Sequence, residues 1–105
     1  MSNFFKSDLV IDTLNTNGDV VIDGDLTVTG DTTTVSTTNT VVSDKLLELA
    51  NGTTGTPSGD AGVVIERGSS NNVFIGWDES EDKVTVATGT FTGASTGDLS
   101  LTDAA

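Results

Sequence analysis

Apolar and polar residues alternate most regularly in the second half of the chain. Segments 62–68, 73–78 and 83–88 are rich in Val, Ile and Phe, and polar turns at 69–72 and 78–82 separate them. Successive side chains of a strand point to opposite faces of a sheet, so a period of two indicates β-structure. These segments predict three strands joined as a meander of hairpins.

The first half of the chain carries a six-residue repeat. The pairs Gly18-Asp19, Gly24-Asp25 and Gly30-Asp31 each open one unit. Because six is even, the third and fifth positions of every extended unit lie on the same face. In the first two units these positions are Val20, Ile22, Leu26 and Val28, and in the third they are Thr32 and Thr34. The repeat predicts one apolar face, with glycines where the backbone turns or approaches another chain.

Other segments also favour extended structure. Residues 9–14 predict a first strand, ended by an Asn-Gly turn, and 31–42 are almost entirely β-branched and polar. Residues 43–50 are the one place where a helix competes, but eight residues are short for a helix and a strand is preferred. Residues 97–102 nearly copy 24–29, so Gly97 joins the repeat glycines.

The chain is therefore expected to have five successive parts within an all-β fold of short strands and hairpins. They are an N-terminal anchor or first strand at 1–17, a repeat and Thr-rich extended segment at 18–50, a loop at 51–61, a β-meander at 62–88, and a C-terminal strand echoing the repeat at 89–105. In the first part, Phe4 and Phe5 form an apolar pair. They either anchor the chain on another protein or plug into its own fold.

The composition favours assembly with other chains. Only 34% of the 105 residues are hydrophobic and 5% aromatic, which is thin for a self-sufficient core. The net charge of -12 would be repelled by phosphate backbones and anionic lipids, so nucleic acid and membrane are poor partners. No apolar run is long enough for a signal peptide or a membrane span, which predicts synthesis in a cytoplasm without membrane insertion.

Catalytic chemistry has few candidate groups. The chain has no Cys, His or Tyr, and neither a GxSxG nor an SxxK motif is present. A carboxylate pair can hydrolyse glycosides, but the acidic residues of 78–82 share one predicted turn and would face solvent. The chain is therefore expected to be neither an enzyme nor the holder of a cofactor.

Calcium is the one cation that the carboxylates suggest, because it prefers hard oxygen ligands. The candidate ligands are Asp19, Asp25, Asp31, Asp78, Glu79 and Asp82. The spacing of the run 78–82 matches neither an EF-hand nor a β-roll repeat. For Asp19, Asp25 and Asp31, the favoured interpretation is that each Asp supports the turn beside its Gly by accepting local backbone N–H bonds, with no metal bound.

Trp77, the only tryptophan, has two interpretations. An exposed Trp can bind sugar, whereas a Trp within a strand more often packs in a core or between chains, and packing is preferred here. The loop at 51–61 is the other candidate for contact with a glycan or receptor.

Five segments together resemble a module of bacteriophage tail fibres and other virion structural proteins, notably of marine and cyanobacterial phages. In order they are GDLTVTG, TTTVSTTNTVV, LLELANG, GVVIERG and VFIGWDESEDKVTV. The resemblance covers residues 18–102, and IERG with GWDES-x-DK is its most specific part. It implies a β-rich homotrimeric fibre in the virion, with attachment functions and contacts to other tail or baseplate proteins.

Two further hypotheses stand beside the virion fibre, and the kind of fibre protein is itself open. Members of that family are often longer and carry distal receptor-binding domains. If the 105 residues are the whole protein, a short fibre, an adaptor or a decoration protein is expected. The repeat GDVVIDGDLTVTGD also resembles bactofilins, which are β-helical proteins that polymerise end to end, although here the repeat fades after three units. A glycan- or receptor-binding adhesin module is the third hypothesis.

Overall fold

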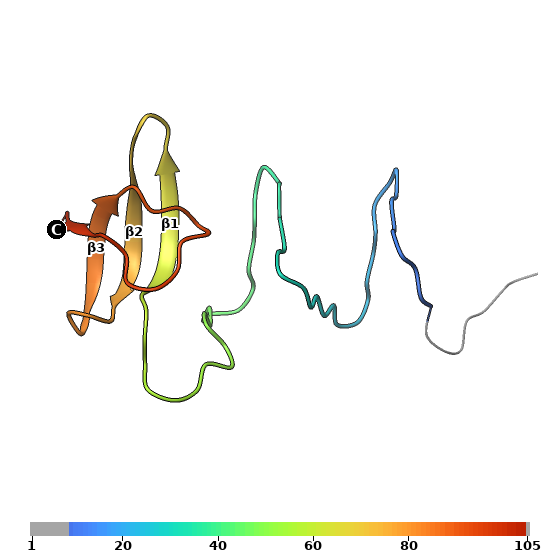
Figure 1. Cartoon of the computed structure of the whole chain (residues 1–105). Helices are drawn as coiled ribbons and strands as arrows, with labels where there is room; N and C mark the ends of the chain where they lie inside the picture. The colour runs from blue at the N-terminus through green and yellow to red at the C-terminus, as the bar shows by residue number, and fades with distance from the viewer. Residues whose placement is uncertain (1–8, 105) are drawn as a thin grey trace, which may run out of the picture. The chain divides into compact units, whose positions relative to one another are not determined.

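The computed structural model describes residues 9–104 and shows one antiparallel sheet (Figure 1). Its strands, in spatial as well as sequence order, are β1 (Ala61–Arg67), β2 (Ser70–Asp78), β3 (Lys83–Gly89) and the short β4 (Thr102–Asp103). No helix occurs among the described residues. The predicted all-β class is confirmed, and so is the meander.

The β1–β2 turn is tighter than predicted. Arg67 pairs with Ser70, which leaves only Gly68 and Ser69 between the strands. Gly68 has a φ of 69°, and a two-residue hairpin turn needs such a left-handed residue. The expected turn at 69–72 is therefore wrong, because β2 starts three residues earlier than its apolar residues suggest. A bulge between Ile65 and Arg67 accommodates the change of register.

The β2–β3 hairpin matches its prediction. The two strands pair without interruption from Asn72–Gly89 to Asp78–Lys83, and residues 79–82 make the acidic turn. Asp82 has a φ of 57°, a conformation that Asp tolerates better than most residues. The polar residues between two alternating runs located this turn correctly.

One face of the sheet is covered by the chain's own residues 90–101, which we call the strap. The strap leaves β3, crosses the sheet and returns to form β4 beside β3 (Figure 1). Its Phe91 ring meets the Phe74 ring of β2 edge to face, with centroids 5.9 Å apart and planes at 75°. Phe74, Ala87 and Phe91 are the buried hydrophobic residues of this core.

A glycine pair makes room for Phe74. Gly62 and Gly76 face each other across β1 and β2. A Cβ on Gly62 would lie 2.9 Å from the Phe74 ring, and one on Gly76 would lie 2.7 Å from it. Both glycines are therefore required by close approach, since any larger residue would push the ring out of the core.

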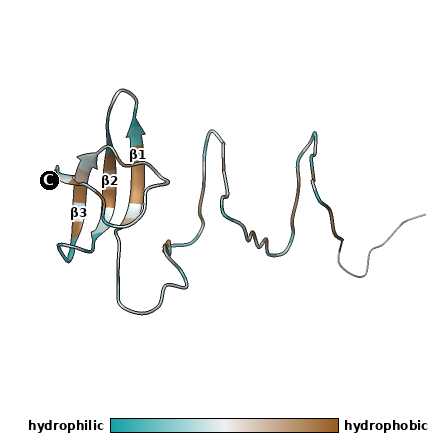
Figure 2. Cartoon of the chain, viewed as in Figure 1, coloured by the Kyte–Doolittle hydropathy of each residue, from teal (hydrophilic) through white to brown (hydrophobic). Residues whose placement is uncertain are grey.

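The opposite face of the sheet is apolar and uncovered, and we call it the open face. Strand pairing sets Val63, Ile75 and Val86 in one cross-strand row, with Trp77 beside Val84 in the next. Figure 2 shows hydrophobic colour along all three long strands. The large exposed side chains of this face are Val63, Ile65, Ile75, Trp77, Val84 and Val86.

The chain separates into two compact units, Met1–Thr40 and Val41–Ala105. This boundary differs from the expected one at residue 50. Residues 41–60 belong to the same unit as the sheet, although they contain no strand. The expected loop at 51–61 ends one residue early, because Ala61 already belongs to β1.

The strands predicted before the sheet do not form. Residues 9–60 contain neither strand nor helix, which contradicts the expected strands at 9–14 and 43–50. The chain bends at 17–18, 23–24 and 30–31, where the repeat glycines lie. A strand needs a neighbouring strand that bonds its N–H and C=O groups, and among residues 9–104 no strand lies beside this segment. A β-branched sequence favours extended backbone but does not by itself provide such a neighbour.

The C-terminal strand is also much shorter than expected. Within 89–105, strand structure beyond the end of β3 is limited to the two residues of β4. Gly97 has a φ of 75°, whereas Gly18, Gly24 and Gly30 have no positive φ. The sequence echo of the repeat at 97–102 is therefore not repeated in the backbone.

Candidate functional site

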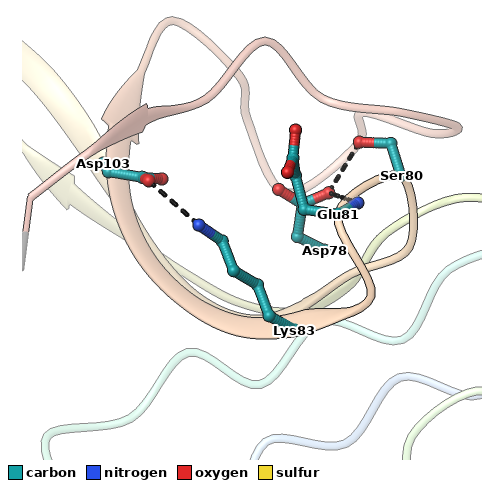
Figure 3. Close-up of polar contacts among 5 residues, drawn as sticks. All are labelled: Asp78, Ser80, Glu81, Lys83 and Asp103. Atoms are coloured by element: carbon teal, nitrogen blue, oxygen red, sulfur yellow. Dashed lines mark hydrogen bonds and ion pairs between the residues drawn. The ribbon is translucent and has the colours of Figure 1, made fainter.

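One carboxylate of the acidic turn, that of Asp78, holds the turn itself. Asp78 is buried, and its Oδ1 accepts hydrogen bonds from Ser80 Oγ at 2.8 Å and from the Glu81 backbone N–H at 3.3 Å (Figure 3). One oxygen thus holds the chain reversal between β2 and β3. Accepting a local backbone N–H in this way is a common role of aspartate at turns.

Asp60 ties together parts of the chain that lie far apart in sequence. Its Oδ1 accepts the Glu79 N–H at 2.9 Å and its Oδ2 accepts the Leu99 N–H at 2.8 Å. Its own backbone N–H donates to the Gly97 carbonyl at 2.9 Å. One partly buried residue before β1 therefore fixes both the β2–β3 turn and the strap.

Trp77 lies on the open face and not in the core of the chain. It is 40% exposed, and its indole Nε1–H donates to Glu79 Oε2 at 2.7 Å. Trp77 is thus not packed in a core of its own chain, while packing between chains and sugar binding both stay predictions. The physical reason is strand parity, which turns Phe74 toward the strap and Trp77 to the other face.

The structure brings Trp77 and the expected loop together. A hollow of about 210 Å³ lies between them, lined by Pro57, Ser58 and Asp60 of the loop and by Trp77 and Glu79 of the sheet. Its wall includes the indole of Trp77 and the carboxylates of Asp60 and Glu79. The two candidates for glycan contact, Trp77 and the loop, therefore lie next to each other in the fold.

A second hollow, of about 330 Å³, lies between the strap and the strands. Val64 and Phe74 line it from the sheet, and Thr92 and Leu99 line it from the strap. No titratable group except Asp60 reaches it. Because Asp60 is already engaged with two backbone N–H groups, this hollow offers no evident acid or base.

An ion pair joins the first residue of β3 to β4. Lys83 Nζ lies 3.2 Å from Asp103 Oδ2 (Figure 3). The hydrogen bond and then the charge of Asp103 raise the pKa of Lys83 above its ordinary value of 10.5, and the charges of Glu81 and Asp78 add to this. The pair lies at the surface, so solvent screens it.

The remaining sequence candidates are not gathered into a site. No group of three or more carboxylates converges to hold a metal ion among residues 9–104. This applies to Asp19, Asp25 and Asp31 of the repeat, and also to Asp78, Glu79 and Asp82 of the turn. Phe4 and Phe5, the candidate anchor, lie outside the described residues.

Sequence reasoning missed the residues that organise the sheet unit. Asp60, Asn72, Phe91 and the Gly62–Gly76 pair all act through distant partners; Asn72, for example, donates to the Phe91 carbonyl at 2.8 Å. The only local signal was Gly inside two otherwise regular strands, which often marks close approach of other atoms.

Comparisons with protein-family models, with curated proteins and with solved structures gave no match for this chain. Among the described residues, no helix is long and apolar enough to cross a membrane.

Proposed function

We propose that this chain is a structural component of a phage virion, a tail fibre or fibre-like attachment protein that assembles as a homotrimer. The observation that carries the proposal is the exposure of apolar side chains along residues 9–49. Val20, Leu26 and Val28, which hold third and fifth positions of the repeat, are each more than half exposed. Such residues are expected to be buried by other chains, because exposed apolar surface on this scale marks interaction.

A second feature supports an assembly role. The segments from GDLTVTG to VFIGWDESEDKVTV resemble fibre modules, and the extended, Thr-rich stretch suits intertwined chains. On this proposal the chain contacts other tail or baseplate proteins at its ends.

The oligomeric state tests this proposal. Light scattering coupled to size-exclusion chromatography should give three times the mass of the chain. A stable monomer would overturn it. Mass spectrometry of purified virions, from a phage whose genome encodes the chain, should detect the protein. Its absence from those virions would contradict the proposal that it is a virion component.

Glycan binding is a second candidate, favoured by the hollow between the loop and Trp77. The indole ring of Trp77 offers a face on which a sugar ring can stack, and the carboxylate oxygens beside it can accept hydrogen bonds from sugar hydroxyls. A glycan array should then give binding that Trp77→Ala abolishes while the protein keeps its assembled mass. Array signals that are equal for both proteins would contradict this candidate. Residues 18–35 contain no strand, so a bactofilin-like β-helix receives no corresponding support.

A further inference from the structure

The open face is the largest ordered apolar surface of the sheet unit. Val84 is 73% exposed, and the other five large residues of the face are between 37% and 48% exposed. Together they leave apolar surface on the order of 500 Å² uncovered, comparable to the largest patch on a typical monomer, which is often functional. The strap covers only the other face.

The chemistry of the face restricts what can cover it. None of its six large side chains carries a charge, and the one polar group, the Trp77 indole N–H, is already bonded to Glu79. A sugar, a charged peptide or a nucleic acid would therefore find no free polar partner among them. A flat apolar surface of similar width fits instead, because sheets pack face to face with their side chains interdigitated.

We infer that the open face packs against the open faces of other copies of this chain. A copy supplies an uncharged surface of matching size and flatness, built from the same β-branched rows. A standard interface buries about 800 Å² per partner, and homo-oligomer interfaces are about 65% apolar. The apolar area estimated here meets that requirement. This inference rests on the proposed assembly of identical chains and assigns the surface that holds the sheets together.

The fluorescence of Trp77 can be used to measure whether the open face is buried. As the only tryptophan, it gives a fluorescence signal from the open face alone. In the assembled protein its emission should be blue-shifted and poorly quenched by acrylamide. Dilution that dissociates the assembly should shift the emission to longer wavelength and increase quenching at least several-fold.

Val84→Glu is the decisive variant, because Val84 is the most exposed of the six and a charge there should not disturb the core. We expect assembly at least tenfold weaker by sedimentation velocity, with Trp77 accessible to acrylamide. Thr96→Glu is the matched control: it adds the same charge at an exposed position of the strap, outside the open face and outside residues 9–49, and should leave Trp77 shielded. Far-UV circular dichroism verifies that the sheet persists in both variants.

The outcomes separate this inference from the proposed function. If the wild type is a trimer in which Trp77 is accessible and Val84→Glu remains trimeric, the inference is overturned and the fibre proposal stands. If the wild type is a dimer that Val84→Glu dissociates, the inference stands and the trimer is overturned. A wild-type monomer with shielded Trp77 would overturn both, because the chain's own residues would then cover the face.

Discussion

The glycine pair of β1 and β2 shows how single residues set the packing of this small core. Phe74 is only 2% exposed because its ring lies over two positions that have no side chain. The core contains only two buried aromatic residues among those described, Phe74 and Phe91, so few other side chains can repack if this fit is lost.

Gly76→Ala is therefore expected to destabilise the sheet unit by about 1–3 kcal/mol, the usual cost of overpacking. The new Cβ would overlap the Ala61 carbonyl oxygen and lie 2.6 Å from the Cα of Gly62, and backbone atoms cannot rotate away. Urea denaturation followed by circular dichroism measures the free energy of unfolding. Gly93→Ala is the control, because a Cβ there meets no atom within 4 Å. Equal stabilities of the two variants would contradict this account.

Asp60 is the residue on which the strap depends. Asp60→Asn keeps the size of the side chain but replaces one acceptor oxygen by an NH₂ group, which cannot accept the N–H of Glu79 or Leu99. Hydrogen bonds to a charged group contribute about 1.5–3 kcal/mol, so a loss of that order is expected. Hydrogen exchange should show faster exchange at the Glu79 and Leu99 amides. Asp98→Asn, at an exposed position of the strap, should leave both rates unchanged.

At the scale of elements, the local sequence pattern was sufficient to predict strands where neighbouring segments pair with each other. The β1–β2–β3 meander follows from alternation and from turn residues between adjacent strands, so all its partners lie nearby in sequence. The strap was not predictable in this way, since Phe91 stands among small polar residues with no period. Strands at 9–14 and 43–50 were predicted from propensity alone, and propensity does not supply a pairing partner.

The local pattern also could not predict which face of the sheet stays open. Alternation in KVTVAT predicts a strand, but not which of its two faces is covered. In the structure Thr85 and Ala87 lie under the strap, while Val84 and Val86 lie on the open face. In the candidate site, Trp77 and the loop could each be selected from the sequence. That they line the same hollow depends on the tertiary fold and could not be predicted.

The docking of β4 on β3 should weaken at high pH. Its ion pair raises the pKa of Lys83, so the pair's contribution is complete below 10.5 and is lost as the pH rises through the raised pKa. NMR titration of the Lys83 side chain should give a higher midpoint in the wild type than in Asp103→Asn. The amide shifts of Thr102 should follow the same midpoint in the wild type only. Identical midpoints in the two proteins would show that the pair does not persist in solution.

At the scale of the whole molecule, charge opposes the assembly that apolar surface favours. Each copy carries a net charge of -12, so bringing copies together concentrates negative charge. The open face itself is uncharged. Attraction between copies should therefore be insensitive to salt, while their repulsion should be screened.

Salt is accordingly expected to strengthen the assembly. The screening length falls from about 30 Å at 0.01 M to about 8 Å at 0.15 M ionic strength, which removes most of the repulsion between acidic surfaces. Sedimentation velocity at these two ionic strengths should show a dissociation constant about tenfold lower at the higher one. Val84→Glu places a further carboxylate on the open face, so its assembly should depend on salt more steeply than that of Thr96→Glu. An assembly that salt dissolves would instead be held by ion pairs, and the apolar face would not be its main contact.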